Sequence, residues 1–204
     1  MVIAIDINDI IRDTSGQFLK TYQKFINPRF ELDENGVHSF NQMEVYPFES
    51  EDALIKFKYV DYPYELYARA SVMENMLPYT FNTWCDKTLK DLDEENIPHI
   101  ILFSPFEMAL SIQSTLAFLS SNVFRCREYY FPTNSMTIYD KADIVITTQP
   151  SLIEQCPENK IVIKIETDYN KDIETKYTYK SLSNVINDPE QLIINILENK
   201  NNDR

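Results

Sequence analysis

Uninterrupted hydrophobic runs alternate along the chain with segments whose apolar residues recur at helical spacing. Runs rich in β-branched residues lie at 2–5, 99–103, 143–146 and 161–165, and a segment with three aromatic residues lies at 127–131. Runs of this length without polar alternation are typical of strands that are buried on both faces of a parallel sheet. The pattern therefore predicts a strand at each of these places.

Helical spacing marks the segments between the strands. These segments are 14–26, with Thr14 or Ser15 as the N-cap; 81–92; and 108–119, with Met108, Ile112, Leu116 and Leu119 on the buried face. A last helix is predicted from Asp188, because a proline and a capping-box glutamine follow it. Strands that alternate with helices predict an α/β fold with a doubly wound parallel sheet, whose ligand crevice lies at the carboxyl ends of the strands.

The segment 27–78 departs from this alternation. It combines prolines, short helical pieces and many aromatic residues, and one piece begins after Ser50, ahead of two acidic residues. We interpret the segment as a small helical cap inserted after the first strand and helix. This interpretation divides the chain into a core of residues 1–26 and 79–204 and a cap of residues 27–78.

Aromatic side chains crowd the middle of the predicted cap. They are Tyr46, Phe48, Phe57, Tyr59, Tyr62, Tyr64 and Tyr67. Such rings can stack on a nucleobase, which contributes ~1–3 kcal/mol per base. They can equally pack the core of the cap or a homodimer interface, where aromatic residues are also enriched. The sequence favours packing and leaves both interpretations open.

Composition and charge narrow the classes of function. The chain has 19 basic and 32 acidic residues and a formal charge of -13, which repels duplex nucleic acid and anionic membrane surfaces. Only two glycines occur, so glycine-rich phosphate loops of the Walker A or dinucleotide type are excluded. The first apolar run is far shorter than the roughly 20 residues of a membrane span. Three cysteines without paired spacing indicate a reducing compartment, and we expect a cytoplasmic protein.

Polar side chains gather where the predicted strands end. They are Asp6 and Asn8 after the first strand, Ser104 after the second, Thr147 and Thr148 after the strand at 143–146, and Lys141 just before that strand. Because parallel strands end at one edge of a sheet, we expect these side chains to share a crevice. A carboxylate, a hydroxyl and an ammonium group suit a phosphoryl group, since the carboxylate can attack phosphorus while the other two neutralise its oxygens.

These positions resemble the motifs of haloacid dehalogenase (HAD) superfamily phosphatases. The first motif of this family is usually Asp-x-Asp, and it is similar to residues 4–13, Ala-Ile-Asp-Ile-Asn-Asp-Ile-Ile-Arg-Asp. The second motif is similar to residues 101–104, Ile-Leu-Phe-Ser. The third and fourth motifs are similar to residues 141–150, Lys-Ala-Asp-Ile-Val-Ile-Thr-Thr-Gln-Pro. The 5'(3')-deoxyribonucleotidase-like branch is the most similar, and it also carries a helical cap between its first two strands. The resemblance implies an HAD-like fold and a phosphomonoesterase that acts on nucleotide monophosphates or other small phosphates.

The resemblance also assigns roles to three residues. Asp6 is the nucleophile that forms an aspartyl-phosphate, Ser104 donates a hydrogen bond to the phosphate, and Lys141 supplies the counter-charge.

Three other positions depart from the family pattern. Asn8 stands where the family has its general acid and base, and an amide cannot exchange a proton near neutral pH. Thr147 and Thr148 replace acidic residues that hold Mg²⁺ in the family, so a metal site of Asp6, Asn8, Thr147 and Thr148 is expected to bind Mg²⁺ weakly or not at all. Two functions stay open: a phosphatase of weak or lost activity, and a non-catalytic pseudophosphatase that binds a small phosphorylated ligand such as a nucleotide.

Overall fold

The computed structural model of the chain describes residues 1–88 and 99–188. Within that part, six strands form one sheet. They are β1 (Val2–Asp6), β2 (His99–Phe103), β3 (Glu128–Tyr130), β4 (Ile144–Thr147), β5 (Ile161–Ile165) and β6 (Thr178–Tyr179). Every neighbouring pair runs parallel, in the order β3-β2-β1-β4-β5-β6, and the predicted α/β fold with a parallel sheet is confirmed. The strand order changes direction at β1: β2 and β3 lie on one side of it and β4 to β6 on the other. In sheets of this kind the ligand crevice lies at such a point, here beyond the carboxyl ends of β1 and β4.

Both faces of the central strands are buried. Ile3 and Ile5 of β1 belong to one hydrophobic cluster and Ala4 belongs to another, on the opposite face. This two-sided burial explains why the strands read as continuous apolar runs. The sequence pattern missed β6, because this edge strand is only two residues long and pairs with β5 through Lys164 and Ile165.

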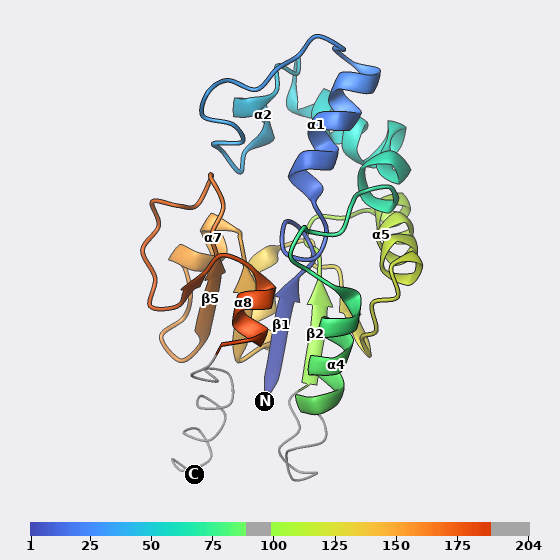
Figure 1. Ribbon diagram of the computed structural model, residues 1–204. Helices are drawn as coiled ribbons and strands as arrows, with labels where there is room; N and C mark the ends of the chain where they lie inside the picture. Colours follow the sequence, from blue (N-terminus) through green and yellow to red (C-terminus); the bar gives the residue numbers. More distant parts are fainter. Residues whose placement is uncertain (89–98, 189–204) are drawn as a thin grey trace.

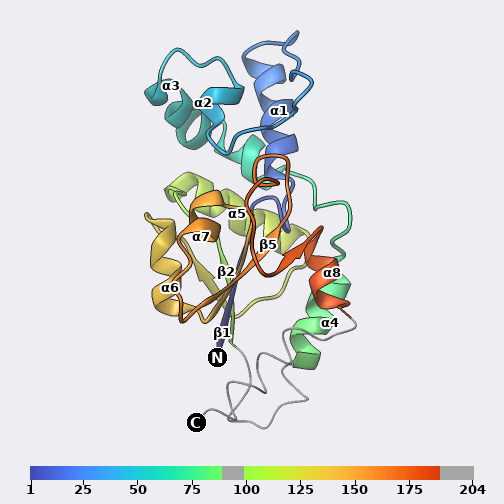
Figure 2. The ribbon, with the colours of Figure 1, turned by 90° about the vertical axis from the view of Figure 1, so that its left-hand side faces the viewer.

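Helices cover both faces of the sheet. They are α4 (Pro78–Thr88), α5 (Ala109–Ser121), α6 (Ile138–Lys141), α7 (Pro150–Glu154) and α8 (Leu182–Ile186), with a 3-10 turn η3 (Ser135–Thr137). The helix α1 (Thr14–Phe25) lies beyond the carboxyl ends of the strands instead (Figure 1). Figure 2 shows α4 and α8 on one side of the strands and α6 and α7 on the other. No helix in the described residues is long and apolar enough to cross a membrane. The helix predicted from Asp188, and the part of the 81–92 helix beyond residue 88, lie outside the described residues.

The helix α1 begins where the sequence predicts, but a different residue caps it. The side chain of Asp13 accepts a hydrogen bond from the backbone N of Gly16 at 2.9 Å. Thr14 and Ser15 are engaged elsewhere: Thr14 Oγ1 donates to Asn8, and Ser15 Oγ donates to Asp9. The prediction of Thr14 or Ser15 as the N-cap is therefore wrong, because these hydroxyls bind the loop that follows β1.

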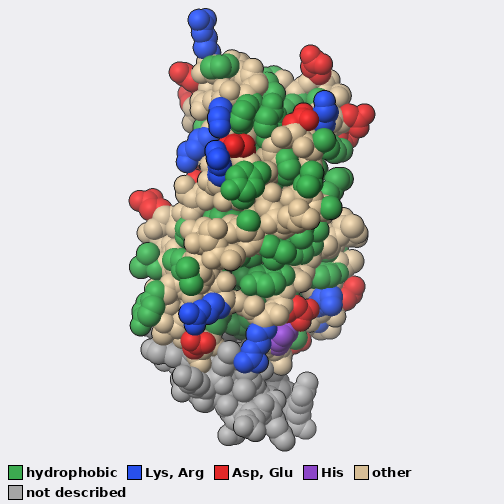
Figure 3. Space-filling model, turned by 90° about the vertical axis from the view of Figure 1, so that its right-hand side faces the viewer, with side chains coloured by type: hydrophobic (Ala, Val, Ile, Leu, Met, Phe, Trp, Pro, Cys, Tyr) green, Lys and Arg blue, Asp and Glu red, His purple; other side chains and the backbone are tan. Residues whose placement is uncertain are grey.

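The helix α5 buries only part of the predicted face: Leu119 is buried as predicted. Met108 is 51% exposed and Leu116 is 39% exposed, whereas Thr115 and Phe118 are fully buried. Figure 3 faces this side of the molecule and shows hydrophobic side chains on its surface. The polar Thr115 lies inward because it donates hydrogen bonds to a buried carboxylate, Glu107. A hydrophobic period could not predict that partner.

The segment of residues 26–68 lies beyond the carboxyl ends of the strands (Figure 1), whereas Ala70 and Met76, between this segment and α4, pack in the core of the sheet. It contains α2 (Gln42–Val45), α3 (Glu51–Lys56) and two π-helical turns, η1 (Phe57–Asp61) and η2 (Tyr64–Ala68). Ser50 caps α3 as predicted, since its Oγ accepts a hydrogen bond from the backbone N of Ala53 at 3.2 Å.

Buried side chains in this region form a hydrophobic cluster separate from those of the sheet. This cap cluster comprises Phe18, Tyr22, Tyr46, Leu54, Phe57, Tyr59, Leu66 and Tyr67. Its rings pack against one another; the centroids of Phe18 and Tyr46 are 4.5 Å apart. The aromatic residues of the cap therefore build a core of their own, although Tyr64 is 56% exposed. Phe18 and Tyr22 belong to α1, so this helix packs with the cap and the cluster extends across residue 26.

Candidate functional site

Asp6 lies at the carboxyl end of β1 and is fully buried. Its Oδ1 accepts a hydrogen bond from the backbone N of Asn8 at 3.0 Å. Its Oδ2 accepts one from Thr147 Oγ1 at 3.2 Å and another from Gln149 Nε2 at 2.6 Å. Both carboxylate oxygens are therefore engaged inside the chain, and neither is open to solvent.

Burial raises the pKa of Asp6 to about 7, although the hydrogen bonds from Gln149, Asn8 and Thr147 act to lower it. The carboxyl group is thus only partly ionised near neutral pH. A carboxylate nucleophile must be ionised and must direct a free lone pair at the atom it attacks. The environment of Asp6 works against both conditions.

Side chains from neighbouring strand ends meet at this position, as the sequence predicts for four of them. Asn8 Nδ2 donates to Ser104 Oγ at 2.8 Å, and Thr147 reaches Asp6. Thr148 is buried nearby, and its backbone carbonyl accepts a hydrogen bond from Asn170 Nδ2 at 2.9 Å.

Lys141 is not brought to this cluster. It ends α6 and precedes β4, whereas Thr147 lies at the far end of that strand. Its side chain is exposed, and Nζ lies 4.8 Å from the centroid of the Tyr130 ring. The ammonium group of Lys141 thus reaches Tyr130, at the carboxyl end of β3, whereas the side chains that bind Asp6 are Thr147 and Gln149, so the expectation that Lys141 joins Asp6 is not met.

A buried ion pair, which the sequence did not reveal, lies beside the cluster. Arg12 is fully buried and its NH2 group lies 3.0 Å from Glu107 Oε1. The guanidinium also donates to Asn8 Oδ1 and Thr115 Oγ1, both at 2.5 Å, and its Cζ lies 4.7 Å from the centroid of the Tyr67 ring. The guanidinium of Arg12 is therefore paired and hydrogen-bonded inside the fold.

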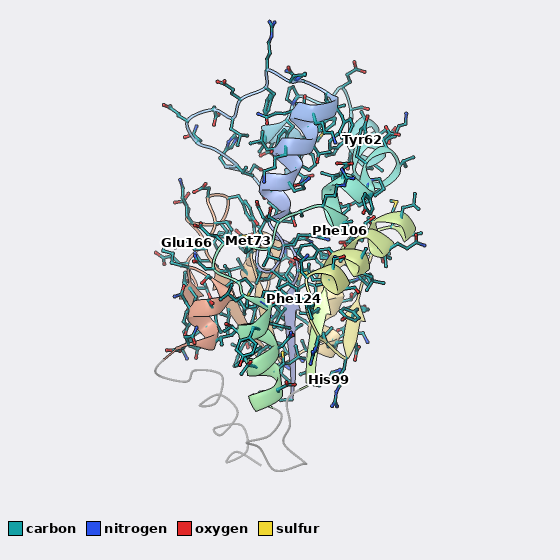
Figure 4. All side chains as sticks on the ribbon, turned by 45° about the vertical axis from the view of Figure 1, so that its right-hand side comes forward. Tyr62, Met73, His99, Phe106, Phe124 and Glu166 are labelled. Atoms are coloured by element: carbon teal, nitrogen blue, oxygen red, sulfur yellow. The ribbon has the colours of Figure 1, made fainter. Side chains whose placement is uncertain are left out.

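A cavity of about 290 Å³ lies between the cap cluster and the carboxyl edge of the sheet. Rings of the cap line it, among them Tyr46, Tyr59 and Tyr67, together with Asn8 and Gln149 from the sheet side. Figure 4 shows its lining residue Phe106 where the cap meets α5, and His99 at the opposite end of the sheet. The aromatic residues of the cap thus pack its core and also form one wall of the cavity.

Two residues in the wall have unusual backbone conformations. Asp9 has φ 54 and Phe106 has φ 63, both in the left-handed region that favours glycine. The Asp9 carboxylate accepts hydrogen bonds from Ser15 Oγ at 2.7 Å and from Tyr169 OH at 3.0 Å, and burial raises its pKa. Strained backbone of this kind clusters at functional sites, so it supports a role for the cavity.

The cluster does not offer the ligands that Mg²⁺ prefers. Carboxylate oxygens and water usually bind this cation, and Asp6 is the sole carboxylate of the predicted metal set of Asp6, Asn8, Thr147 and Thr148. Its Oδ2 faces the hydrogens of Gln149 Nε2 and Thr147 Oγ1, which repel a cation. Within the described residues, no group of three or more His, Cys, Asp and Glu side chains is arranged to hold a metal ion.

Gln149 is the site residue that sequence reasoning passed over. It stands at the N-cap of α7, directly before a proline, and its side chain makes no capping hydrogen bond. Glutamine is not a favoured N-cap residue. A long amide side chain at a position that prefers short ones is a signal that the side chain serves another contact.

A scan against models of protein families and a search of curated proteins found no match to the chain.

Proposed function

We propose that this chain is a non-catalytic, HAD-like protein that binds a small molecule in the cavity between cap and sheet. The observation that carries the proposal is the sealed carboxylate of Asp6. It is 0% exposed, and the Gln149 amide occupies Oδ2 at 2.6 Å.

Phosphoryl transfer to Asp6 would require a carboxylate oxygen within about 3–3.5 Å of phosphorus, with its lone pair in line. The Gln149 side chain would have to leave before a phosphate could approach. Asn8 cannot protonate a leaving group, and Lys141 lies away from the cluster. Three requirements of the phosphatase mechanism are thus unmet together.

The cavity itself supports binding. Its volume of about 290 Å³ lies at the lower end of the range of small-molecule sites, about 300–1,000 Å³. Apolar and aromatic walls with a few convergent polar groups are the usual features of such sites. The cavity has both kinds of wall, from the cap cluster and from the strand ends.

The second candidate is the phosphomonoesterase that the resemblance implies. One observation favours it: Asp6, Asn8, Ser104 and Thr147 meet at the carboxyl ends of their strands. In this case the cap and Gln149 would have to open during each turnover.

Hydrolysis assays separate the two candidates. Wild type and Asp6→Asn are incubated with p-nitrophenyl phosphate and with nucleoside monophosphates, with and without Mg²⁺. We expect release of phosphate at the background rate in both proteins. Release above background by the wild type that disappears in Asp6→Asn would instead establish the phosphomonoesterase.

A further inference from the structure

Buried polar atoms in the wall of the cavity lack hydrogen-bond partners within the described part of the chain. They are Tyr46 OH and Gln149 Oε1, on residues that are each 2% exposed, and Gln42 Oε1. All three residues line the cavity. A buried polar group without a partner costs about 1–3 kcal/mol, and folded proteins satisfy nearly all of them. A molecule in the cavity is the natural source of the missing partners.

The orientation of Gln149 defines which partner it needs. Its Nε2 donates to Asp6 Oδ2 at 2.6 Å, which leaves Oε1 as a pure hydrogen-bond acceptor. The unpartnered atom of Gln42 is also a carbonyl oxygen. Tyr46 OH can donate or accept. A ligand with N–H or O–H donors would therefore satisfy the two carbonyl oxygens and can also bind the hydroxyl.

Charged groups around the cavity suit a phosphate poorly. Among the described lining residues, Asp9 and Glu107 are acidic and Lys58 is the single basic residue. Lys58 Nζ already lies 5.0 Å from the centroid of the Tyr59 ring, and Arg12 is paired with Glu107 behind the wall. Because Arg12 neutralises Glu107, a phosphate dianion would meet the carboxyl group of Asp9 and one lysine, with no second basic group in the described wall to bind it. An uncharged or cationic group meets no such repulsion.

The aromatic wall suits a flat ring. The rings of Tyr59 and Tyr67 are nearly parallel, with an angle of 11° and centroids 6.3 Å apart. Aromatic side chains stack on planar heterocycles and attract cations over their faces.

We infer that the cavity binds a flat, uncharged or cationic heterocycle that carries an amino donor and no phosphate, with Gln149 Oε1 accepting from that donor. This inference rests on the proposed binding function. A ligand of this class and a phosphorylated ligand can be distinguished by measuring the affinities of matched probes with and without a phosphate.

Isothermal titration calorimetry of the full chain with three probes tests the inference. Adenosine has a purine ring with an amino donor, purine riboside lacks the donor, and adenosine 5'-monophosphate adds a phosphate. We expect adenosine to bind about tenfold more tightly than purine riboside, the effect of one hydrogen bond to a buried acceptor. We expect adenosine 5'-monophosphate to bind no more tightly than adenosine.

Matched variants connect this preference to Gln149. Gln149→Met keeps the length of the side chain and removes its carbonyl oxygen, so adenosine and purine riboside should then bind equally. Thr147→Ser keeps the hydroxyl that donates to Asp6 Oδ2 and accepts from the backbone N of Gln149, so the tenfold preference should persist. Circular dichroism of both variants verifies that they fold.

The outcomes separate the inference from the function on which it rests. Tighter binding of adenosine 5'-monophosphate than of adenosine, a preference that survives in Gln149→Met, or no binding of any probe would overturn the ligand class and leave the non-catalytic function standing. Hydrolysis of adenosine 5'-monophosphate that requires Asp6 would overturn the proposed function itself.

Discussion

The two walls of the cavity differ in how their polar groups are satisfied. On the sheet side, Asp6, Asn8 and Arg12 are hydrogen-bonded within the chain. On the cap side, Tyr46 OH and Gln42 Oε1 have no partner among the described residues; Gln149, at the edge of the sheet, has its Nε2 bound to Asp6 and its Oε1 without a partner. The carboxylate, amide and guanidinium groups at the strand ends thus already have hydrogen-bond partners inside the chain. The atoms that can still form hydrogen bonds with a ligand are Tyr46 OH, Gln42 Oε1 and Gln149 Oε1.

The largest effect is expected from breaking the sheet-side network at its buried ion pair. Arg12→Met leaves the Glu107 carboxylate buried and without its cation, which should lower the free energy of unfolding by about 3–5 kcal/mol. Urea denaturation measures the loss. Arg69→Met is the control, since Arg69 forms an exposed pair with Glu65 at 3.1 Å that should contribute less than about 1 kcal/mol. Equal losses in the two variants would contradict the assigned difference in burial.

The second prediction concerns the pH dependence that Asp6 confers. Its pKa is about 7 when folded and near 3.8 when unfolded, so between these values the folded state binds more protons than the unfolded state. Stability conferred by the protonated carboxyl is therefore present at low pH and is lost as the pH rises from about 4 to 7, by at most about 4 kcal/mol. Asp6→Asn should remove this decline. Unfolding curves of both proteins at pH 4 to 8 measure it, and parallel profiles would show that the pKa of Asp6 is not raised.

A smaller effect is expected when acidic residues are introduced into the cluster. Thr147→Asp combined with Thr148→Asp adds two carboxylates beside Asp6, and Mg²⁺ affinity should rise at least tenfold. Calorimetric titration with Mg²⁺ measures the change. Thr147→Asn with Thr148→Asn is the matched control without charge. Micromolar binding of Mg²⁺ by the unmodified chain would mean that the threonines are not the defect assigned to them.

The smallest effects compare a tyrosine that packs against the sheet with a tyrosine in the cap wall of the cavity. Tyr139 OH donates to the carbonyl of Leu152 at 2.6 Å, whereas Tyr46 OH has no partner among the described residues. Tyr139→Phe should destabilise the protein by about 1 kcal/mol, because it leaves a buried carbonyl unpaired. Tyr46→Phe should leave stability unchanged or raise it by about 1 kcal/mol, because it removes an unsatisfied group. Thermal unfolding of the two variants gives the comparison, and a destabilised Tyr46→Phe would reveal a partner for that hydroxyl.

The hydrophobic pattern was sufficient for β1 to β5, though not for the edge strand β6, and for several helix starts. Burial on both faces requires apolar side chains at consecutive positions, so the β1 and β5 runs were visible in the sequence. Ser50 was recognisable because an N-cap acts on neighbouring residues only. The meeting of Asp6, Asn8, Ser104 and Thr147 was also predictable, since parallel strands end at one edge.

What the tertiary structure alone decided is how those residues are used. Gln149 caps the carboxylate of Asp6 from 143 positions away, and Arg12 finds Glu107 across 95 positions. Periodicity describes which residues leave water, and it is a local property of the chain. The partner of a buried polar group is set by the packing of distant segments, and that packing joined the polar strand ends in a closed hydrogen-bond network beside a cavity lined by aromatic rings.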